Sequence, residues 1–279
     1  MTTLRAVEEL PAALAAHSSP GRVADELAAR LSGRRPAVFL DYDGVLTPIV
    51  ARPEDAVWSD GMRRTVRELA DRCSVCIVTG RDREVVQQLM GVDDLVVAGS
   101  HGFDIWSPAT GPIAHDVLDD FTDLVGEVTA LLRERVDGIA GVGIEPKRAS
   151  VAVHYRQADP ADRPRVTALV ETLLAENSGR LDMVPGKMVY ELKPAVDWDK
   201  GRAVLHLIDV LGLTGEEVLP LYLGDDITDE DAFRALQGRG VGILVGSPDD
   251  PEMAERRTAA DFVLPSVDAV QDFLSVLGR

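Results

Sequence analysis

Short apolar runs alternate with amphipathic stretches in the first part of the chain. We expect strands at residues 37–40, 74–78 and 95–98, and helices at residues 61–71 and 82–90. Strand and helix follow each other strictly, which is typical of a parallel sheet with helical crossovers. This part of the sequence therefore predicts the first half of an open α/β domain.

The pattern changes after residue 112. Beyond it the sequence predicts two helices and three strands, the helices at 118–136 and 163–176 and the strands at 150–155, 181–184 and 188–192. Strands grouped around two helices without strict alternation are typical of an α+β unit. We therefore predict an inserted domain over residues 113–194.

Strict alternation resumes after the insertion. A helix ending near residue 210 is followed by strands at 219–223, 241–245 and 261–264 and by a final helix to residue 277. The predicted fold class is α/β, with a Rossmann-like core and a parallel sheet. This core is formed by residues 36–112 and 195–279, and the α+β insertion interrupts it.

Residues 1–35 predict a helical extension in front of the core. It consists of two short amphipathic helices around the break at 18–21, the second of them over 23–31. No residue in it suggests chemistry, so we expect it to pack on the core or to serve in association.

Two acidic residues follow the first core strand directly. Asp41 and Asp43 precede Gly44, at the strand end where open α/β sheets bind their ligands. Burying two carboxylates there is costly unless a cation or a reaction requires them. Asp41 is suited to attack a phosphoryl group, and Asp43 to exchange protons with the leaving oxygen and with water. A magnesium ion would bridge Asp41 and the phosphoryl group.

Two structural explanations compete with this chemistry. A calcium-binding loop needs an oxygen ligand, a glycine and a glutamate at its fifth, sixth and twelfth positions. Those positions hold Val45, Leu46 and Arg52, which excludes that loop. Ordinary turn formation by Asp and Gly stays open on these residues alone.

A second acidic cluster follows the strand at 219–223. Asp225 and Asp226 stand at the strand end, and the carboxyl ends of parallel strands meet at one edge of a sheet. We expect Asp225 on the metal ion and Asp226 beside it, so that Asp41, Asp43, Asp225 and Asp226 form the magnesium site. Helix capping explains the following segment, Thr228–Asp231, because acids are favoured in a first helical turn.

Further residues are suited to hold a phosphate group. Thr79, Gly80 and Arg81 follow the strand at 74–78 and offer a hydroxyl, a free backbone amide and a cation. Lys200, at a predicted helix start, supplies a point charge for the phosphoryl group or for Asp41. A turn and a surface lysine are the ordinary alternatives.

Composition limits the possible partners. The chain has 279 residues, 46% of them hydrophobic, and a net charge of −18, which argues against nucleic acids and anionic membranes. It has no apolar run near the length of a membrane helix and no signal-peptide pattern, so we expect a cytoplasmic protein. Cys73 and Cys76 stand in a predicted strand and are expected to be small core residues rather than a redox pair.

These motifs together resemble the haloacid dehalogenase (HAD) superfamily of phosphotransferases. Its four motifs occur in order at Asp41–Pro48, Thr79–Arg81, Lys200 and Gly224–Glu230. The resemblance implies a nucleophile at Asp41, an acid/base at Asp43, phosphoryl binding by the second and third motifs, and magnesium on the fourth. It also implies that the insertion is a C2-type cap that selects the substrate.

Within that superfamily the chain resembles the trehalose-6-phosphate phosphatases. The resemblance rests on Gly224–Phe233, Gly99–Gly102 and three cap segments, Glu145–Lys147, His154–Arg156 and Gly186–Pro194. It implies that the cap residues reach the sugar hydroxyls. The residues expected to bind the sugar are Glu145, Lys147, Arg156, Lys187 and Glu191.

Several alternatives stay open at this point. The same chemistry serves sucrose phosphate, a glycosyl-phosphoglycerate or a pseudo-disaccharide phosphate, and a phosphomutase shares the catalytic residues. A non-catalytic sugar-phosphate sensor, or a subunit that regulates a synthase, is an alternative of another class. The expected activity is magnesium-dependent hydrolysis of trehalose 6-phosphate through an aspartyl-phosphate. The sequence leaves the oligomeric state open, with a monomer favoured.

Overall fold

The computed structural model describes residues 5–6, 27–50, 52–113, 121–186, 188–247, 253 and 256–278. The chain divides into two compact units. The catalytic unit comprises Met1–Pro112 and Trp198–Arg279, and the cap unit comprises Ile113–Asp197. The insertion expected at 113–194 thus begins where the second unit begins and ends three residues before it.

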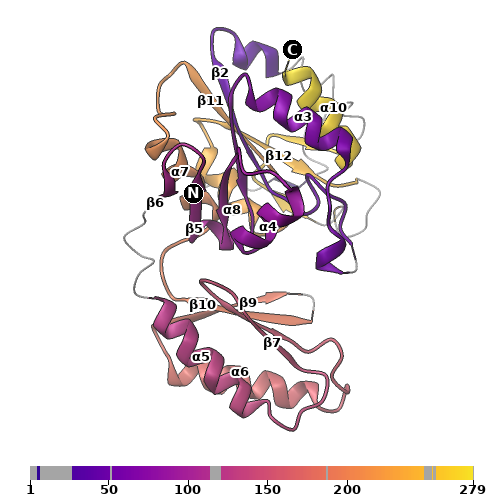
Figure 1. Ribbon diagram of the computed structural model, residues 1–279, viewed down its shortest axis with the longest axis vertical. Coiled ribbons are helices and arrows are strands. Elements are labelled where there is room, and N and C mark those ends of the chain that lie inside the picture. Colours follow the sequence, from indigo (N-terminus) through magenta and orange to yellow (C-terminus); the bar gives the residue numbers. More distant parts are fainter. Residues whose placement is uncertain are drawn as a thin grey trace. The chain divides into compact units, whose positions relative to one another are not determined.

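An eight-stranded sheet forms the centre of the catalytic unit, in the order β14-β12-β11-β2-β3-β4-β5-β6. Its first six strands are parallel: β14 (Phe262–Leu264), β12 (Val241–Val245), β11 (Val218–Gly224), β2 (Arg35–Leu40), β3 (Ser74–Val78) and β4 (Val96–Gly99). These strands and the helices between them confirm the predicted α/β class (Figure 1).

Two strands at one edge of the sheet were not predicted. β5 (Asp104–Ser107) pairs antiparallel with β4, and β6 (Gly111–Ile113) follows it. The sheet is therefore mixed rather than wholly parallel. The two strands have only four and three residues. The prolines and the glycine at residues 108–112 indicate a turn, and they hid the short apolar pattern on either side of it.

Helices cover both faces of the sheet. α3 (Asp60–Ala70), α4 (Arg83–Met90) and α10 (Val267–Leu277) share one apolar core with alternate side chains of the central strands, such as Val38 and Leu40. α7 (Lys200–Val210) and α8 (Asp229–Leu236) pack against each other and against the sheet. Ser59 caps α3, because its Oγ accepts the Met62 amide at 3.0 Å.

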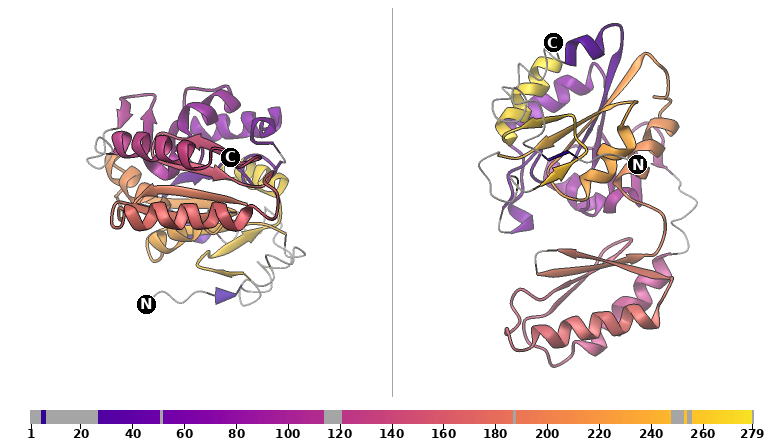
Figure 2. Two further views of the ribbon diagram at one scale, coloured as in Figure 1. Left: turned by 90° about the horizontal axis from the view of Figure 1, so that it is seen from below. Right: turned by 180° about the vertical axis from the view of Figure 1, so that it is seen from behind.

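The cap unit is an antiparallel sheet with two helices on one face (Figure 2). Its strands are β7 (Gly143–Pro146), β8 (Val151–His154), β10 (Val189–Pro194) and β9 (Leu181–Gly186), in that order. α5 (Phe121–Arg135) and α6 (Arg163–Glu176) bury Leu132, Val170 and other apolar residues against Val151, Val153 and Leu192. Strand β7 was missed because its four residues include a glycine and a proline.

The N-terminal region differs from its prediction where the structure describes it. Arg5–Ala6 (β1) pairs antiparallel with Arg257–Thr258 (β13), whereas a helix was expected there. Residues 27–31 are helical as predicted, and the rest of the expected helical extension lies outside the described residues. Local periodicity could not reveal a strand partner some 250 residues away.

The two cysteines are free, and neither is exposed. Burial raises the pKa of the Cys73 thiol to about 11 and that of Cys76, which also lies near Cys73, to about 12. Cys76 lies in β3 and is buried, as expected, whereas Cys73 lies in the bend before that strand and is partly buried against the core.

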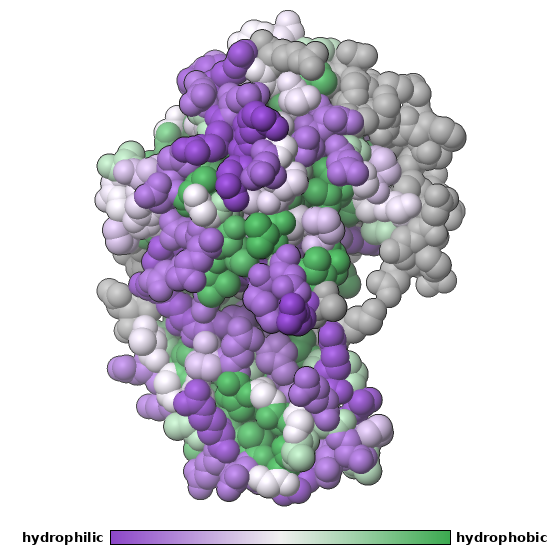
Figure 3. Space-filling model, turned by 45° about the vertical axis from the view of Figure 1, so that its right-hand side comes forward, coloured by the Kyte–Doolittle hydropathy of each residue, from purple (hydrophilic) through white to green (hydrophobic). Residues whose placement is uncertain are grey.

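One face of the molecule is mainly hydrophilic, with smaller apolar areas on it (Figure 3). Hydrophilic side chains predominate on the face that Figure 3 shows, in keeping with the 27% of charged residues in the chain. Among the described residues, none of the helices combines the length and the apolar content needed to cross a membrane.

Candidate active site

Three polar loops meet at the carboxyl edge of the central sheet. Strand β2 lies between β11 and β3, so the loop with Asp41 has the loops of Asp225 and Thr79 on either side. The predicted convergence of the acidic strand ends follows directly from this strand order.

Asp41 is buried, with 5% of its surface exposed, and is held by three hydrogen bonds. Its backbone amide donates to the Leu223 carbonyl at 2.9 Å, which continues the β2–β11 pairing. Its Oδ1 accepts the Tyr42 amide at 2.6 Å, and its Oδ2 accepts Lys200 Nζ at 2.6 Å. The carboxylate therefore has a defined orientation.

Lys200 stands in the first turn of α7, where the Asp199 side chain caps the helix. The lysine is 3% exposed, and its ammonium binds Asp229 Oδ1 at 2.7 Å in addition to Asp41. The next residue, Gly201, lets α7 approach α8 closely, since a Cβ there would lie 2.4 Å from the Asp231 carbonyl oxygen. The sequence predicted that Lys200 would reach Asp41 or the phosphoryl group, and the ammonium does contact Asp41.

Asp229 is the central acceptor of this network, a role that sequence reasoning missed. Its side chain is fully buried and also accepts the Tyr222 hydroxyl at 2.6 Å. Its Oδ2 accepts the backbone amides of Asp225 and Asp226, each at 2.9 Å. Asp229 stands in the first turn of α8, as predicted, but its contacts go well beyond those of a residue that only stabilises a helix end. The predicted cap residue, Thr228, makes no side-chain cap hydrogen bond. Its four-residue spacing from Asp225 was the available signal.

The pKa values reflect a shortage of positive charge. Burial raises the pKa of Asp41 to about 7, although Lys200 opposes the shift. Burial also acts on Asp229, but Lys200 and the Tyr222 hydrogen bond lower its pKa below the usual range. Burial lowers the pKa of Lys200, but Asp229 and Asp41 outweigh it and the net shift is upward. Lys200 therefore stays an ammonium, and Asp229 holds it most strongly.

Asp41, Asp225 and Asp229 form a carboxylate triad that could hold a metal ion. One carboxylate oxygen from each lies within 4.8 Å of the other two. Burial, followed by repulsion from Asp41 and Asp229, raises the pKa of Asp225 to about 8. When all three carboxylates are ionised, the single ammonium of Lys200 leaves two negative charges, and a divalent cation would balance them and favour the ionised forms.

Gly44 makes the close approach of Asp225 possible. A Cβ at this position would lie 2.0 Å from Asp225 Oδ2, and the backbone φ of +70° lies in the left-handed region. Any other residue would displace the carboxylate from the triad.

Asp43 and Asp226, also predicted as metal ligands, are not members of the triad in the described structure. Asp43 forms a two-pronged ion pair with Arg81, with Nε–Oδ2 and Nη2–Oδ1 distances of 2.6 and 2.7 Å. Arg81 Nη1 donates to the Pro53 carbonyl at 2.8 Å. Asp226 is exposed, and its Oδ1 accepts the Ile227 amide at 2.6 Å. Arg81, predicted for phosphate, therefore orients the predicted acid/base.

The loop with Thr79 and Gly80 is braced by the segment after β4. Thr79 is 1% exposed, and its carbonyl accepts the His101 amide at 2.8 Å. The Arg81 carbonyl accepts the Ser100 amide at 2.7 Å. Ser100 and His101 have φ values of +50° and +57°, which is strained for residues with a side chain. The strained turn is maintained by its contacts with the predicted phosphate loop.

The predicted sugar-binding residues that the structure describes lie in or beside the cap sheet. Glu145 and Glu191 flank Ala152 in register across β7, β8 and β10, so they share one face. Glu191 Oε1 accepts Lys147 Nζ at 3.1 Å and the Ser150 hydroxyl at 2.6 Å.

The remaining cap residues differ in their surroundings. Glu145 Oε2 lies 2.7 Å from His154 Nε2. Arg156 is exposed beyond β8, and Lys187 lies outside the described residues. The contacts of Ser150 and His154 with the predicted glutamates were not foreseen, although His154 stands in a segment that carried the resemblance.

The fold is that of a haloacid dehalogenase-like hydrolase from Bacteroides thetaiotaomicron, whose solved structure superimposes with a TM-score of 0.63 at 16% identity and covers 86% of this chain and 98% of that one. The model of the trehalose-phosphatase family matches residues 39–268, which span both units. The chain belongs to the trehalose-phosphatase family.

Named relatives agree with this assignment. The chain is 41% identical over 254 residues to trehalose-phosphate phosphatase of Mycobacterium tuberculosis, covering 91% of this chain and 64% of the relative. It is 36% identical over 273 residues to probable trehalose-phosphate phosphatase 4 of Oryza sativa subsp. japonica, covering 96% of this chain and 72% of the relative. Part of each relative therefore lies beyond the match.

A solved structure shares the fold over both units. The trehalose-6-phosphate phosphatase structure of Aspergillus fumigatus superimposes with a TM-score of 0.65 at 29% identity. The match covers 91% of this chain and 96% of that one.

Proposed function

We propose that this chain hydrolyses trehalose 6-phosphate to trehalose and inorganic phosphate, with Mg²⁺ as its cofactor. The observation that carries the reaction type is the buried set of Asp41, Lys200 and Asp229 at the carboxyl edge of the sheet. The substrate is supported by membership of the trehalose-phosphatase family and by the names of the relatives.

The acidic triad fits Mg²⁺ in charge and in donor type. Carboxylate oxygens are the ligands that Mg²⁺ prefers, and the triad carries two negative charges in excess of Lys200. Asp41, Asp225 and Asp229 would hold the ion, with Asp43 and Asp226 as the further candidates from the sequence. When bound, the ion would neutralise charge on the phosphoryl oxygens and on Asp41.

Asp41 acts as the nucleophile in the proposed reaction. Its carboxylate oxygen forms a bond to phosphorus while the bond from phosphorus to the sugar oxygen breaks, and an aspartyl-phosphate results. The Tyr42 amide and Lys200 orient the carboxylate for attack. Because burial raises its pKa to about 7, ionisation of Asp41 depends on the positive charge gathered around it.

Asp43 moves the protons in both steps. It donates a proton to the leaving sugar oxygen, and then accepts one from the water that attacks phosphorus and releases Asp41. Arg81 binds both oxygens of Asp43, so it fixes the orientation of the carboxyl group. Thr79, Gly80 and Lys200 supply the donors proposed for the phosphoryl oxygens.

The cap supplies substrate recognition in this proposal. A disaccharide offers many hydroxyl groups and little apolar area, so its binding needs charged donors and acceptors. Glu145, Lys147 and Glu191 share one region of the cap and are partnered by other polar side chains. Such pairs exchange one hydrogen bond for another when a sugar arrives. Arg156 and Lys187 complete the proposed set.

The test is phosphate release from a panel of sugar phosphates with and without Mg²⁺. We expect strong preference for trehalose 6-phosphate over sucrose 6-phosphate and a glucosyl-phosphoglycerate, and loss of turnover with a chelator. Preference for another ester would overturn the assignment of the cap but not of the catalytic residues. Binding without turnover would favour the sensor, and transfer of phosphate to a sugar would favour a mutase. Cytoplasmic location and a monomeric state stay predictions.

A further inference from the structure

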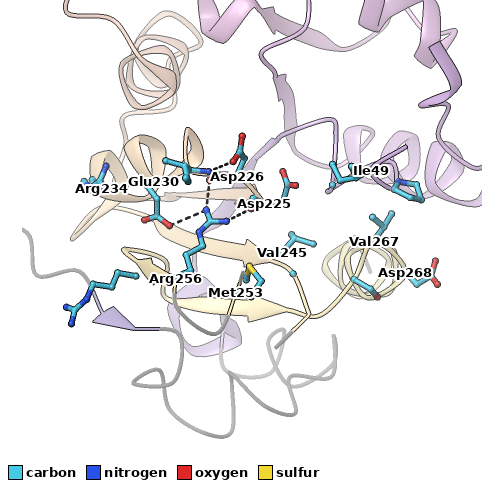
Figure 4. A pocket seen from close by; sticks show the side chains of 16 residues that line it. Ile49, Asp225, Asp226, Glu230, Arg234, Val245, Met253, Arg256, Val267 and Asp268 are labelled. Atoms are coloured by element: carbon cyan, nitrogen blue, oxygen red, sulfur yellow. Dashed lines mark hydrogen bonds and ion pairs between the residues drawn. The ribbon is translucent and has the colours of Figure 1, made fainter. Parts of the chain in front are cut away.

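Arg256 holds the carbonyl side of the loop that carries Asp225. Its Nη1 donates to the Asp225 carbonyl oxygen and its Nη2 to the Asp226 carbonyl oxygen, as the dashed lines in Figure 4 show. The same Nη2 lies 3.4 Å from Glu230 Oε1. A single planar guanidinium therefore binds three acceptors in and just after this acidic loop, from a position 30 residues further along the chain.

The contacts with Asp225 and Glu230 are partly buried, and the contact with Asp226 is exposed. The side chain of Arg256 is 13% exposed and that of Glu230 is 5% exposed. A guanidinium removed from water costs free energy unless acceptors take its N–H groups. Hydrogen bonds from a charged donor are about twice as strong as neutral ones. The arginine and the two carbonyl groups thus hold one another in place.

Glu230 ties the arginine segment to helix α8 at a second point. Its Oε2 accepts the Ala259 amide at 2.8 Å, while its other oxygen faces Arg256. The segment that contains Arg256 and Ala259 is therefore attached both to the acidic loop and to the first turn of α8.

The opposite side of the same loop is held by Asp229. Asp229 Oδ2 accepts the amides of Asp225 and Asp226, whose carbonyl oxygens accept Arg256. Both residues are thus fixed through their amide and their carbonyl groups. Arg256 binds the backbone of Asp225 and not its side chain. The Asp225 carboxylate therefore stays available to the triad with Asp41 and Asp229.

We propose that Arg256 is a positioning residue for the magnesium site. By fixing the backbone carbonyls of Asp225 and Asp226, it holds the Asp225 carboxylate within reach of Asp41 and Asp229. This inference rests on the proposed function only in taking the triad as a Mg²⁺ site. The inference deepens that function, because Arg256 lies outside all four catalytic motifs of the sequence.

The experiment compares three variants by calorimetric titration of Mg²⁺ into the full chain without substrate. R256M removes the guanidinium, and R256K keeps the charge but lacks the fork that spans two carbonyls. R234M is the matched control. Arg234 and Arg256 line one pocket (Figure 4), but Arg234 pairs with Asp231 at 2.8 Å on the surface of α8.

We expect R256M and R256K each to weaken Mg²⁺ binding about 10- to 100-fold, as loss of outer-shell partners does at other metal sites. R234M is expected to bind within about threefold of the unchanged protein, because exposed ion pairs contribute little. At saturating Mg²⁺, the KM for the sugar phosphate should be unchanged in all three variants. In a fourth variant, R256A, guanidinium ions at low millimolar concentration should restore Mg²⁺ affinity, whereas methylammonium should not.

Several results would overturn the proposal. One is a folded R256M variant that binds Mg²⁺ with the affinity of the unchanged protein. If only its melting temperature fell, Arg256 would stabilise the fold without positioning the metal site. Another is full affinity in R256K, which would show that charge alone matters. If R256M does not fold, by circular dichroism, R256K decides the question. Mg²⁺ binding with no release of phosphate from any ester would refute the proposed function. The positioning role of Arg256 would then still be decided by the Mg²⁺ affinities of the variants.

Discussion

The charged network of the candidate active site, in the catalytic unit, contrasts with an exposed charged pair in the cap. In the catalytic unit, Asp41, Lys200 and Asp229 have side chains that are 7%, 2% and 0% exposed and are joined by bonds of 2.6 and 2.7 Å. In the cap, the Glu145 and His154 side chains of one pair are 57% and 48% exposed. The residues proposed for the chemistry are thus buried charges, whereas this pair, proposed for sugar recognition, is accessible.

The difference follows from what each unit has to do. A buried ion network costs several kcal/mol of desolvation per ion, so every member needs a partner in fixed geometry. That requirement holds a nucleophile in one orientation. Accessible pairs contribute little stability, about 0–1 kcal/mol, so a ligand can replace one partner at small cost. Fixed charge suits catalysis, and exchangeable charge suits the binding of a polar sugar.

The largest effect is expected from Asp41→Asn, which tests the buried side of the comparison. Asparagine keeps the shape of the side chain but is not a nucleophile, so turnover should fall by at least about 10⁴-fold. Phosphate release at saturating Mg²⁺ measures this, with circular dichroism to show that the fold is intact. Turnover close to that of the unchanged protein would rule out the covalent route.

The next largest effect concerns stability. Lys200→Met leaves Asp41 and Asp229 without their shared cation, so the free energy of unfolding should drop by about 3–5 kcal/mol. Glu145→Gln removes the charge from the exposed Glu145–His154 pair of the cap and should cost about 1 kcal/mol or less. Urea denaturation of both variants without metal makes the comparison direct. Equal losses would mean that the two units do not differ as described.

A smaller effect is expected for substrate recognition. Glu191→Gln weakens an acceptor that binds Lys147 and Ser150, and it should raise the KM for trehalose 6-phosphate about 10- to 100-fold with little change in kcat. Hydrolysis of p-nitrophenyl phosphate, which carries no sugar, serves as the control and should be unaffected. A loss of kcat on both substrates would place Glu191 outside sugar recognition.

The last effect concerns a group outside both sites, Cys73, which is partly buried without a charged partner. Its pKa is raised to about 11 by burial, so at pH 8 the folded chain should carry about 100-fold less thiolate than an unfolded one. Reaction with Ellman's reagent should be correspondingly slow until the chain is unfolded.

The same shift sets the sign of the effect of pH on stability. A thiol whose pKa is raised on folding contributes stability that is present below about pH 9, its unfolded value, and lost as pH rises towards 11. Alkaline denaturation of Cys73→Ala should therefore be less steep in that range. Rapid labelling of the folded chain at pH 8 would contradict the burial of this thiol.

Much of the fold followed from local pattern. Buried strands of a parallel sheet are short apolar runs, and their carboxyl ends share one edge, so Asp41 and Asp225 were correctly expected to meet. Lys200 was expected near Asp41 and contacts it. The short strands β5, β6 and β7 and the pairing of Arg5–Ala6 were missed, because so few residues carry no clear periodicity.

The sequence by itself determined the succession of elements, the strand ends that carry acids and the family. Only the tertiary structure decided the partners. It showed that Asp229, which was expected only to stabilise a helix end, binds Lys200, and that Asp43 pairs with Arg81. It also brought Arg256 to the Asp225 loop. The physical reason is distance along the chain. Local periodicity records which face of an element is buried, whereas contacts between residues 29 to 159 positions apart depend on how the elements pack.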